Sequence, residues 1–560
     1  MTALMPALAL LLPLALAVAA LTPARRWIGA ALVAAPLPAL VLAFAREREA
    51  VWSLPAVLTG VGFGADGLGL VFLQLTAVLW LAAGIYAAAV FRGDRALPRF
   101  AFFFLLCLAG NVGVALARDV VGFYTCFTLM SFAAYGLVVH DAGAGARRAG
   151  LTYIVLVVIG EACLVAGLLF GGALDALGFA QWPAALAAAP QRELILALLF
   201  IGLGIKAGAV PLHVWMPGAY AAAPAVAGAV LSGAMSAAGV LGWLRFFPGG
   251  ETPATGWAAA FVAGGLLAAF YGVVVGVTQR DPKALLAYSS ISQMGLMTLT
   301  VGLGLAEPSA WPLAAAAAGF YALHHGLAKG ALFLGADLVA RGGSRAAGWM
   351  AMAGLALAAL SIAAAPFTAG MAAKALLKDA AYASGFWKDA VQGLLPLTSA
   401  ATMLLLARFL VIVRPAAAPK TAPPRGALVA FAALVVAAMT LPWVQIASVP
   451  GAGVGAKAVW SALWPVLAGA AAGLLIGRIP RLAGAIPAGD LLVPVQTLLR
   501  RLRGAWRLVL EASLPPVREP DGRRLAELTQ RWESWIERWP VAGVAVMLLI
   551  AALVLGWSLP

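Results

Sequence analysis

The sequence carries little charge, and this scarcity sets its class. Only 11% of the 560 residues are charged, whereas 63% are hydrophobic. Soluble domains carry about 25% charged residues. The composition therefore argues against a soluble enzyme domain and is typical of a protein that crosses a membrane many times.

Residues that hold metals or redox groups are also scarce. The chain has 3 cysteines and 4 histidines. Cys107, Cys126 and Cys163 stand alone in apolar stretches and form no CxxC pair, which argues against iron–sulfur or zinc ligation. No motif for flavin, NAD or haem is present. We expect no cofactor, and any redox chemistry would belong to a partner protein.

The sequence does contain many apolar runs. Fifteen or sixteen are long enough to cross a bilayer, which takes about 20 residues. They lie near 3–22, 27–45, 66–91, 99–117, 119–139, 149–172, 193–209, 224–246, 256–278, 284–305, 309–340, 350–384, 391–413, 426–446, 457–477 and 541–558. Because backbone groups in lipid must be hydrogen-bonded within the protein, these runs predict helices and not a barrel. The first run lacks a basic flank, so we interpret it as a helix and not as a cleaved signal.

Basic residues gather in alternate loops. The net charge is +15, and one set of alternate loops holds more basic residues than the opposite set: Arg25, Arg26, Arg92, Arg95, Arg99, Arg147, Arg148, Arg280, Lys283, Arg341, Arg345, Arg414, Lys420 and Arg425. This is the positive-inside pattern of a membrane protein and not a nucleic-acid surface. It predicts a bacterial-type inner membrane location, with both termini on the non-cytoplasmic side.

Two apolar segments are interrupted by glycine and proline beside a lysine. One surrounds Lys206 and the other surrounds Lys374. Interrupted segments at corresponding places in two halves are typical of transporters built from inverted repeats. We therefore predict repeats over 99–246 and 256–413, preceded by helices in 1–98 and followed by core helices in 426–477.

The end of the chain has a different composition. Residues 478–540 are rich in arginine and predict a basic amphipathic helix on the cytoplasmic surface. Residues 541–560 predict a final transmembrane anchor. The surface segment is either a solvated anchor or a lateral brace against a neighbouring subunit.

Few ionisable residues fall inside the apolar runs, and they indicate function. A charge at mid-helix costs roughly 2.5–3.5 kcal/mol on insertion scales. Lys206, Lys329 and Lys374 lie within or at the edge of such runs. A lysine removed from water can lose and regain its proton, which arginine does not do. His325 lies four residues before Lys329 on one helix face, so the two make a plausible proton relay.

Four stretches resemble the antiporter-like subunits of complex I, membrane-bound hydrogenases and Mrp-type cation/proton antiporters. VTQRDPKALLAYSSISQMGLMT is similar to that family's DxKxxLAYSSISxxG signature. GIKAGAVPLHVWMPGAYAAAPA, HHGLAKGALFLGAD and PFTAGMAAKALL are similar to its other lysine-bearing segments. The resemblance implies an all-α fold of fourteen core helices with two inverted five-helix repeats, each containing a broken helix, around a polar axis that carries protons.

The resemblance also assigns roles to individual residues. It implies proton transfer by Lys206, His325, Lys329 and Lys374. Accessory candidates are Thr128, His324, His213 and Asp337. Asp66 is interpreted as structural, and Asp281 and Lys283 are interpreted as fixing the start of a helix.

The sequence departs from the family pattern in the first half. Thr128 stands where the family has a glutamate that pairs with the lysine at 206, and Ala237 or Ser236 stands where many relatives have a lysine or histidine. Glu161 lies about 12 residues into the run 149–172, at a depth similar to that of Lys206. We predict that Glu161 replaces the missing glutamate; the alternative is a neutral Glu161 hydrogen-bonded in its own helix or to Thr128.

The preferred function is a proton-conducting membrane subunit of a larger redox- or ion-coupled complex, which is not catalytic alone. Expected partners are other membrane subunits, the lipid bilayer, protons and sodium as an alternative ion, but no nucleic acid. The short tail favours a hydrogenase-like or Mrp-like assembly over complex I itself. Two alternatives stay open: a stand-alone or Mrp-type cation/proton antiporter, and a non-conducting structural subunit.

Overall fold

The computed structural model describes residues 4–45, 50–55, 60–172, 177–413, 423–446, 456–476, 484–489 and 491. The chain divides into two compact units, Met1–Ile486 and Pro487–Pro560. The predicted surface segment and final anchor lie outside the described residues, apart from 484–489 and 491. The fold below is that of the first unit.

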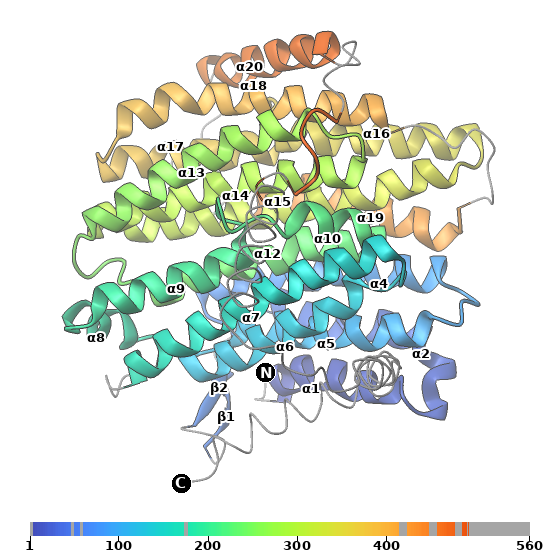
Figure 1. Ribbon diagram of the computed structural model, residues 1–560, viewed down its shortest axis with the longest axis horizontal. Helices are drawn as coiled ribbons and strands as arrows, with labels where there is room; N and C mark the ends of the chain where they lie inside the picture. Colours follow the sequence, from blue (N-terminus) through green and yellow to red (C-terminus); the bar gives the residue numbers. More distant parts are fainter. Residues whose placement is uncertain are drawn as a thin grey trace, which may run out of the picture. The chain divides into compact units, whose positions relative to one another are not determined.

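The described residues are almost all helical, as the sequence predicted (Figure 1). The elements of the first half are α1 (Leu4–Ala19), η1 (Pro23–Trp27), α2 (Ile28–Ala34), α3 (Leu37–Phe44), β1 (Trp52–Leu54), β2 (Val61–Phe63), α4 (Gly67–Val90), α5 (Leu97–Leu116), α6 (Val120–Val138), α7 (Ala144–Gly172), α8 (Trp182–Ala188), α9 (Arg192–Ala207), α10 (Met216–Ala222), α11 (Ala225–Val230), the π-helix η2 (Leu231–Met235) and α12 (Ser236–Phe246). The second half contains α13 (Thr255–Gly276), α14 (Pro282–Ala306), η3 (Pro308–Ala310), α15 (Trp311–Arg341), α16 (Arg345–Ile362), α17 (Ala369–Ser384), α18 (Lys388–Ile412), α19 (Arg425–Ile446) and α20 (Ala456–Ile476).

Twelve helices among the described residues are long and apolar enough to cross a membrane. Helices α9, α15 and α17 are not among these twelve, although each lies on a predicted span. They carry Lys206, Lys329 and Lys374. The helices that hold the candidate lysines are therefore shorter or more polar than their neighbours, which is why a composition test passes over them.

Aspartates fix where several helices begin. The side chains of Asp66, Asp119 and Asp281 accept hydrogen bonds from the backbone N–H groups of Gly69, Gly122 and Ala284, at 2.7, 2.7 and 2.8 Å. This N-cap satisfies one of the free N–H groups at a helix start. Asp66 also binds the Arg245 guanidinium at the end of α12, with 2.7 Å between Oδ1 and Nη2. Both Asp66 and Asp281 hold helix ends in place.

Two predicted spans are interrupted. The run 193–209 ends at Ala207, and the chain becomes helical again only at Met216. The run 350–384 is two helices, α16 and α17, separated by six residues that include Ala364 and Phe367 at positive φ. The breaks therefore lie beside Lys206 and Lys374, as the glycines and prolines indicated. That the two halves are related by inversion stays a prediction.

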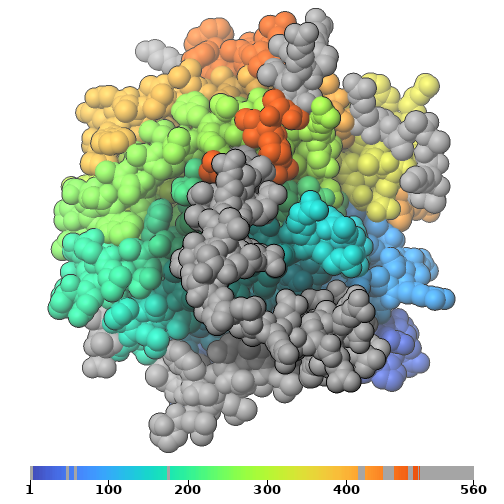
Figure 2. Space-filling model, in the orientation of Figure 1, coloured from blue at the N-terminus to red at the C-terminus, as the bar shows by residue number. Residues whose placement is uncertain are grey.

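The centre of the first unit is formed by α14 and α15. Every residue of the apolar window of α14 is buried, and α15 packs against α4, α11, α14, α16, α17 and α19. Figure 2 draws the view of Figure 1 with all atoms, and the coloured helices around the rim are in contact with their neighbours. Polar side chains on these central helices, such as Gln293, His325 and Lys329, are buried.

Two features were not expected from the sequence. β1 and β2 form an antiparallel hairpin in the register Trp52↔Phe63, Ser53↔Gly62 and Leu54↔Val61. The short helix α8 lies between α7 and α9. Both lie in connections between long helices, where apolar periodicity gives no information.

Candidate functional site

Lys206 lies at the last turn of α9 in a small buried pocket. Its side chain is 4% exposed, and Nζ donates a hydrogen bond of 3.3 Å to the hydroxyl of Tyr153 on α7. The ammonium also faces the rings of Phe127 and Tyr153, each centred 5.8 Å away. The Tyr153 hydroxyl donates in turn to the carbonyl of Ser131, at 2.7 Å. The ammonium is thus held by a hydroxyl and two aromatic faces.

Glu161 lines the same pocket from α7. The two helices approach closely at Gly160 and Gly202, where an added Cβ on Gly202 would meet the carbonyl oxygen of Gly160 at 2.8 Å. Glu161 is 7% exposed. Its Oε2 accepts a hydrogen bond of 2.7 Å from the Thr128 hydroxyl on α6.

Glu161 and Lys206 do not form a direct ion pair among the described contacts. Both side chains line a pocket with Phe127, Tyr153 and Trp215, and its free space is about the size of one water molecule. The two groups therefore share one small pocket without touching each other. The Glu161 carboxylate lies beside residue 128, although it comes from α7.

The break after Lys206 is fixed by three contacts. Gly208 ends α9 at φ 75°, and an added Cβ there would meet the sulfur of Met216 at 2.2 Å. The N–H of Ala209 donates to the carbonyl of Gly204, at 2.9 Å. The indole N–H of Trp215, beyond the break, donates to the carbonyl of Ile205 at 2.7 Å. These contacts hold the chain after the break against the last turn of α9, which carries Lys206.

Lys329 and His325 lie at the middle of α15 and are fully buried. Lys329 Nζ donates to the backbone carbonyl of Leu286 on α14, at 2.9 Å. Neither ring nitrogen of His325 has a hydrogen-bond partner among the described residues. Buried polar groups are nearly always hydrogen-bonded, so His325 departs from that rule.

His324 reaches the second break. Its Nδ1 lies 3.4 Å from the hydroxyl of Ser361 near the end of α16. Its Nε2 lies 3.1 Å from the position that a Cβ on Gly370 would occupy, in the first turn of α17. The sequence put His325 ahead of His324 as a link between lysines. The geometry brings His324 to the helix that carries Lys374.

Lys374 is bound by two hydroxyl groups of α18. Nζ donates to Thr398 Oγ1 at 2.8 Å and to Ser399 Oγ at 2.6 Å, and the residue is 9% exposed. No described acidic side chain lies within ion-pair distance of Lys206, Lys329 or Lys374. Burying a charge without an acidic partner is costly. The surroundings of the three lysines therefore favour the neutral amine over the ammonium.

Further side chains connect Lys374 to the centre. The hydroxyl of Thr402 donates to the Thr398 carbonyl at 2.7 Å and accepts from the Gln293 amide at 3.1 Å. The Tyr321 hydroxyl donates to Gln293 Oε1 at 2.8 Å. Tyr321 lies one turn before His325 on α15. A polar chain therefore joins α15, α14 and α18 to α17.

The remaining candidates have other surroundings. His213 is buried, and its ring packs against Tyr271 with centroids 5.1 Å apart. Asp337 Oδ2 accepts from Arg341 Nε at 2.7 Å and from the Tyr86 hydroxyl at 2.6 Å. These contacts join the ends of α4 and α15. Neither residue lies against the three lysines in the described contacts.

Sequence reasoning missed the neutral partners of the lysines. Tyr153, Thr398 and Ser399 hold Lys206 and Lys374 from helices distant in sequence. A signal was present in the segment PLTSA, where proline and two adjacent hydroxyl residues interrupt an apolar run. No such signal marks Tyr153, since a single tyrosine in an apolar helix is common.

The comparisons with known proteins concern the family and the fold. Residues 117–395 match the family described as NADH:quinone oxidoreductase/Mrp antiporter, transmembrane region. The chain is a member of this antiporter-like family. The matched range contains Thr128, Glu161 and Lys206 as well as His325, Lys329 and Lys374.

Individual relatives and solved structures extend the comparison. The antiporter-like chain is 29% identical over 286 residues to hydrogenase-4 component B of Escherichia coli K12, which covers 49% of this chain and 42% of that protein. A structure of the Mrp complex from Dietzia sp. aligns with a TM-score of 0.70 at 21% identity, over 96% of this chain and 63% of the other. A structure of the membrane-bound sulfane sulfur reductase, an archaeal respiratory membrane complex, aligns at 0.67 and 23% identity over 98% and 99%. At these identities the two structures support the fold alone, and the chain spans less than half of the curated relative.

Proposed function

We propose that this antiporter-like chain conducts protons through the membrane as one subunit of a larger complex. The observation that carries the proposal is the set of three buried lysines, each hydrogen-bonded only to neutral groups. A proton can leave and return to such an amine, because no bound carboxylate fixes its charge. Proton transport by this chain rests on that chemistry and on its family.

The proposed route runs from the first break to the second. Glu161 and Lys206 form its first station, with Glu161 in place of the glutamate expected at Thr128. His325 and Lys329 form the centre, and His324 leads towards Lys374. The replacement is supported by the pocket that Glu161 and Lys206 line together. The hydrogen bond of 2.7 Å from Thr128 to Glu161 is the contact that the alternative, a neutral Glu161, also predicts.

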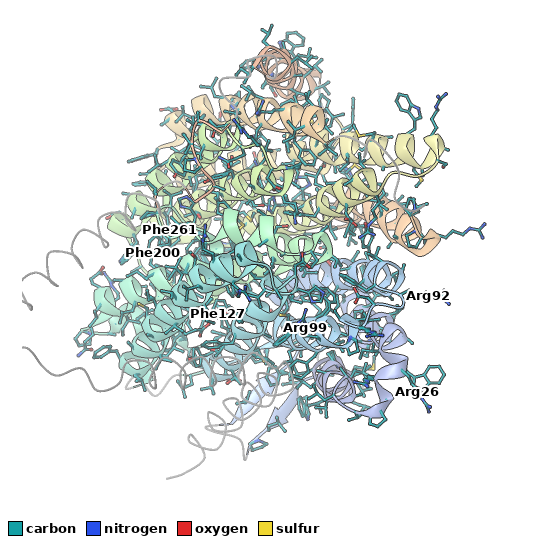
Figure 3. The ribbon with its side chains drawn as sticks, turned by 45° about the vertical axis from the view of Figure 1, so that its right-hand side comes forward. Arg26, Arg92, Arg99, Phe127, Phe200 and Phe261 are labelled. Atoms are coloured by element: carbon teal, nitrogen blue, oxygen red, sulfur yellow. The ribbon has the colours of Figure 1, made fainter. Side chains whose placement is uncertain are left out.

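The proposed orientation puts the basic loops in the cytoplasm. Figure 3 labels Arg26 and Arg92, which lie at the same edge of the helices. Loops 92–99, 278–283 and 341–345 would then face the cytoplasm with them, and the N-terminus would face the opposite side. The partners would be further membrane subunits, and the coupling ion would be the proton or sodium.

Transport by the assembled complex tests the proposal. We would purify the complex through a tag on this chain, reconstitute it into liposomes, and follow internal pH with a fluorescent dye under an imposed membrane potential or sodium gradient. Lys206→Met, Lys329→Met and Lys374→Met keep the side-chain volume but cannot hold a proton. We expect each to lower proton flux about tenfold or more while the complex still assembles.

Lys378→Met is the matched control. Lys378 is one turn after Lys374 on α17 but is exposed, with Nζ 5.9 Å from the ring centre of Tyr382. Its replacement should leave flux unchanged. If the three buried-lysine variants transport protons as well as the Lys378 variant, the chain is a structural subunit and the proposal is wrong.

A further inference from the structure

Helix α10 is a short piece of the broken span that carries Lys206. It has 7 residues, and it is separated from α9 by the break and from α11 by Ala223 and Pro224. A helix of this length is marginal by itself. Its position therefore depends on contacts with the surrounding helices.

The first contact lies at the end of α10 nearest Lys206. Trp215 directly precedes α10, and its indole N–H donates to the carbonyl of Ile205 at 2.7 Å. Ile205 is the residue before Lys206 in the last turn of α9. The indole also packs against the ring of Tyr153, which accepts the hydrogen bond of the Lys206 amine, with ring centroids 5.0 Å apart. Trp215 thus forms one wall of the pocket around Lys206.

The second contact lies at the far end of α10. Lys283, in the first turn of α14, donates from Nζ to the backbone carbonyl of Ala223 at 2.8 Å. Ala223 is the residue that ends α10, where backbone carbonyls lack partners within the helix. The Asp281 cap fixes the start of α14, from which the Lys283 side chain extends. Helix α10 is consequently bound to the Lys206 turn at one end and to the central helix α14 at the other.

Lys283 differs from the three buried lysines in its surroundings. It is half-buried at a helix start, and its described hydrogen bond goes to a backbone carbonyl that holds α10 and not to a side chain of the proposed route. An amine in this position can act on the route through α10 without carrying a proton itself.

We propose that Lys283 is a positioning residue, which holds the end of α10 and so keeps Trp215 against Ile205 in the wall of the Lys206 pocket. The inference rests on the proton-conducting function proposed above. In this role Lys283 donates a hydrogen bond and never has to release a proton. Without that hydrogen bond α10 can move away from α14, and Trp215 no longer holds Tyr153 and the Lys206 amine in the geometry that proton exchange needs.

Two substitutions of Lys283 in the reconstituted complex test the role. Lys283→Met keeps the length of the side chain and removes the donor, so we expect proton flux about tenfold or more below the native value, with the same subunits bound. Lys283→Arg keeps a donor for the Ala223 carbonyl but cannot exchange protons, so it should recover most of the flux. Flux as low in the arginine variant as in the methionine variant would mean that Lys283 carries protons itself, and would overturn the positioning role.

A double variant tests whether the effect passes through α10. Trp215→Phe deletes the hydrogen bond to Ile205 and should also lower proton flux. Because substitutions within one connected set of contacts are not additive, adding Lys283→Met to Trp215→Phe should lower the flux less than about twofold further. Two reductions that multiply would show independent effects and overturn the connection between Lys283 and the pocket.

Arg345→Met is the matched control, because Arg345 is an exposed basic residue in the first turn of α16. Its replacement should leave flux unchanged. Should Lys283→Met fail to assemble, Lys283→Gln removes the charge and shortens the side chain, and it is judged by the same criterion. Flux within twofold of native in the assembled variant, with Lys206→Met still inactive, overturns the positioning role alone. Native flux in Lys206→Met overturns the proposed function itself.

Discussion

At the scale of single residues, the pocket around Lys206 brings together side chains that are far apart in the sequence. The carboxylate comes from α7, yet it is hydrogen-bonded to Thr128 of α6. Lys206 lines the same small pocket. In the proposed route the carboxylate of this pocket comes from α7 and not from α6.

An exchange of the two side chains tests this interpretation. Glu161→Thr should lower proton flux about tenfold or more, because the pocket loses its carboxylate. Adding Thr128→Glu to that variant should recover much of the flux. Glu193→Gln, at an exposed carboxylate in the first turn of α9, is the control and should transport normally. Native flux in Glu161→Thr alone would assign Glu161 a purely structural role.

At the scale of elements, the break after α9 depends on one glycine. Gly208 has φ 75° and faces Met216. Gly93 has φ 82° but has no heavy atom within 4 Å of an added Cβ. Comparing alanine variants of the two glycines therefore distinguishes the cost of backbone strain, which both share, from the cost of crowding, which only Gly208 has.

Gly208→Ala should destabilise the protein more than Gly93→Ala. Backbone strain costs each variant about 1–2 kcal/mol, and the displaced Met216 adds roughly 1–3 kcal/mol at Gly208. Heating the purified protein and measuring the monodisperse fraction compares the two. Equal loss in both variants would mean that Met216 yields without cost and that crowding does not hold the break.

A second element-scale feature is the pair that joins α4 to α12. Burial raises the pKa of Asp66, but the hydrogen bonds and charge of Arg245, with the N–H of Gly69 and the charge of Arg118, hold that pKa below its usual value. A carboxylate with a lowered pKa stabilises the folded state above its unfolded pKa of about 3.9. That stability is lost as pH falls through the folded value.

Asp66→Asn should therefore act in a pH-dependent way. Asparagine keeps the helix cap and removes the charge that binds Arg245, so at pH 7 the variant should be less stable by roughly 1–3 kcal/mol. The difference should shrink below about pH 4, as the native carboxylate takes up a proton. Thermal unfolding at several pH values measures this. Asp94→Asn, at an exposed cap with no arginine partner among the described ion pairs, should cost less.

The sequence predicted the helices and their breaks better than it predicted the contacts between side chains. Long apolar runs predicted the spans, and Gly208 and Pro366 marked both breaks, because local chemistry alone decides where a helix stops. The hydroxyl partners of Lys374 were not predictable, since Thr398 and Ser399 meet it only after α17 and α18 pack. Which histidine faces α17 depends on the rotation of α15, and both histidines lie in the same run.

At the scale of the whole molecule, the basic loops predict one orientation in the membrane. Gly93 lies in an exposed turn after α4, and Glu251 lies in an exposed turn after α12. In the proposed orientation these turns face opposite sides. The native Cys107 and Cys126 are buried, so both are shielded from a water-soluble thiol reagent.

Cysteine labelling in cells tests the orientation. A membrane-impermeant maleimide should label Glu251→Cys in intact cells, because that turn would face outwards. Gly93→Cys should react only after the membrane is broken. The native protein corrects for any reaction of Cys163. The reverse labelling pattern would invert the proposed orientation but leave the proton route unaffected.

The hydrogen bond between Thr128 and Glu161 also bears on how such a site changes over evolutionary time. A chain with glutamate at both positions would hold two carboxyl groups almost in contact, and such a pair shares one proton instead of carrying two charges. Its total charge would equal that of a chain with a single carboxylate. The glutamate can therefore pass from one helix to its neighbour through an intermediate that keeps the charge of the pocket, in two single substitutions.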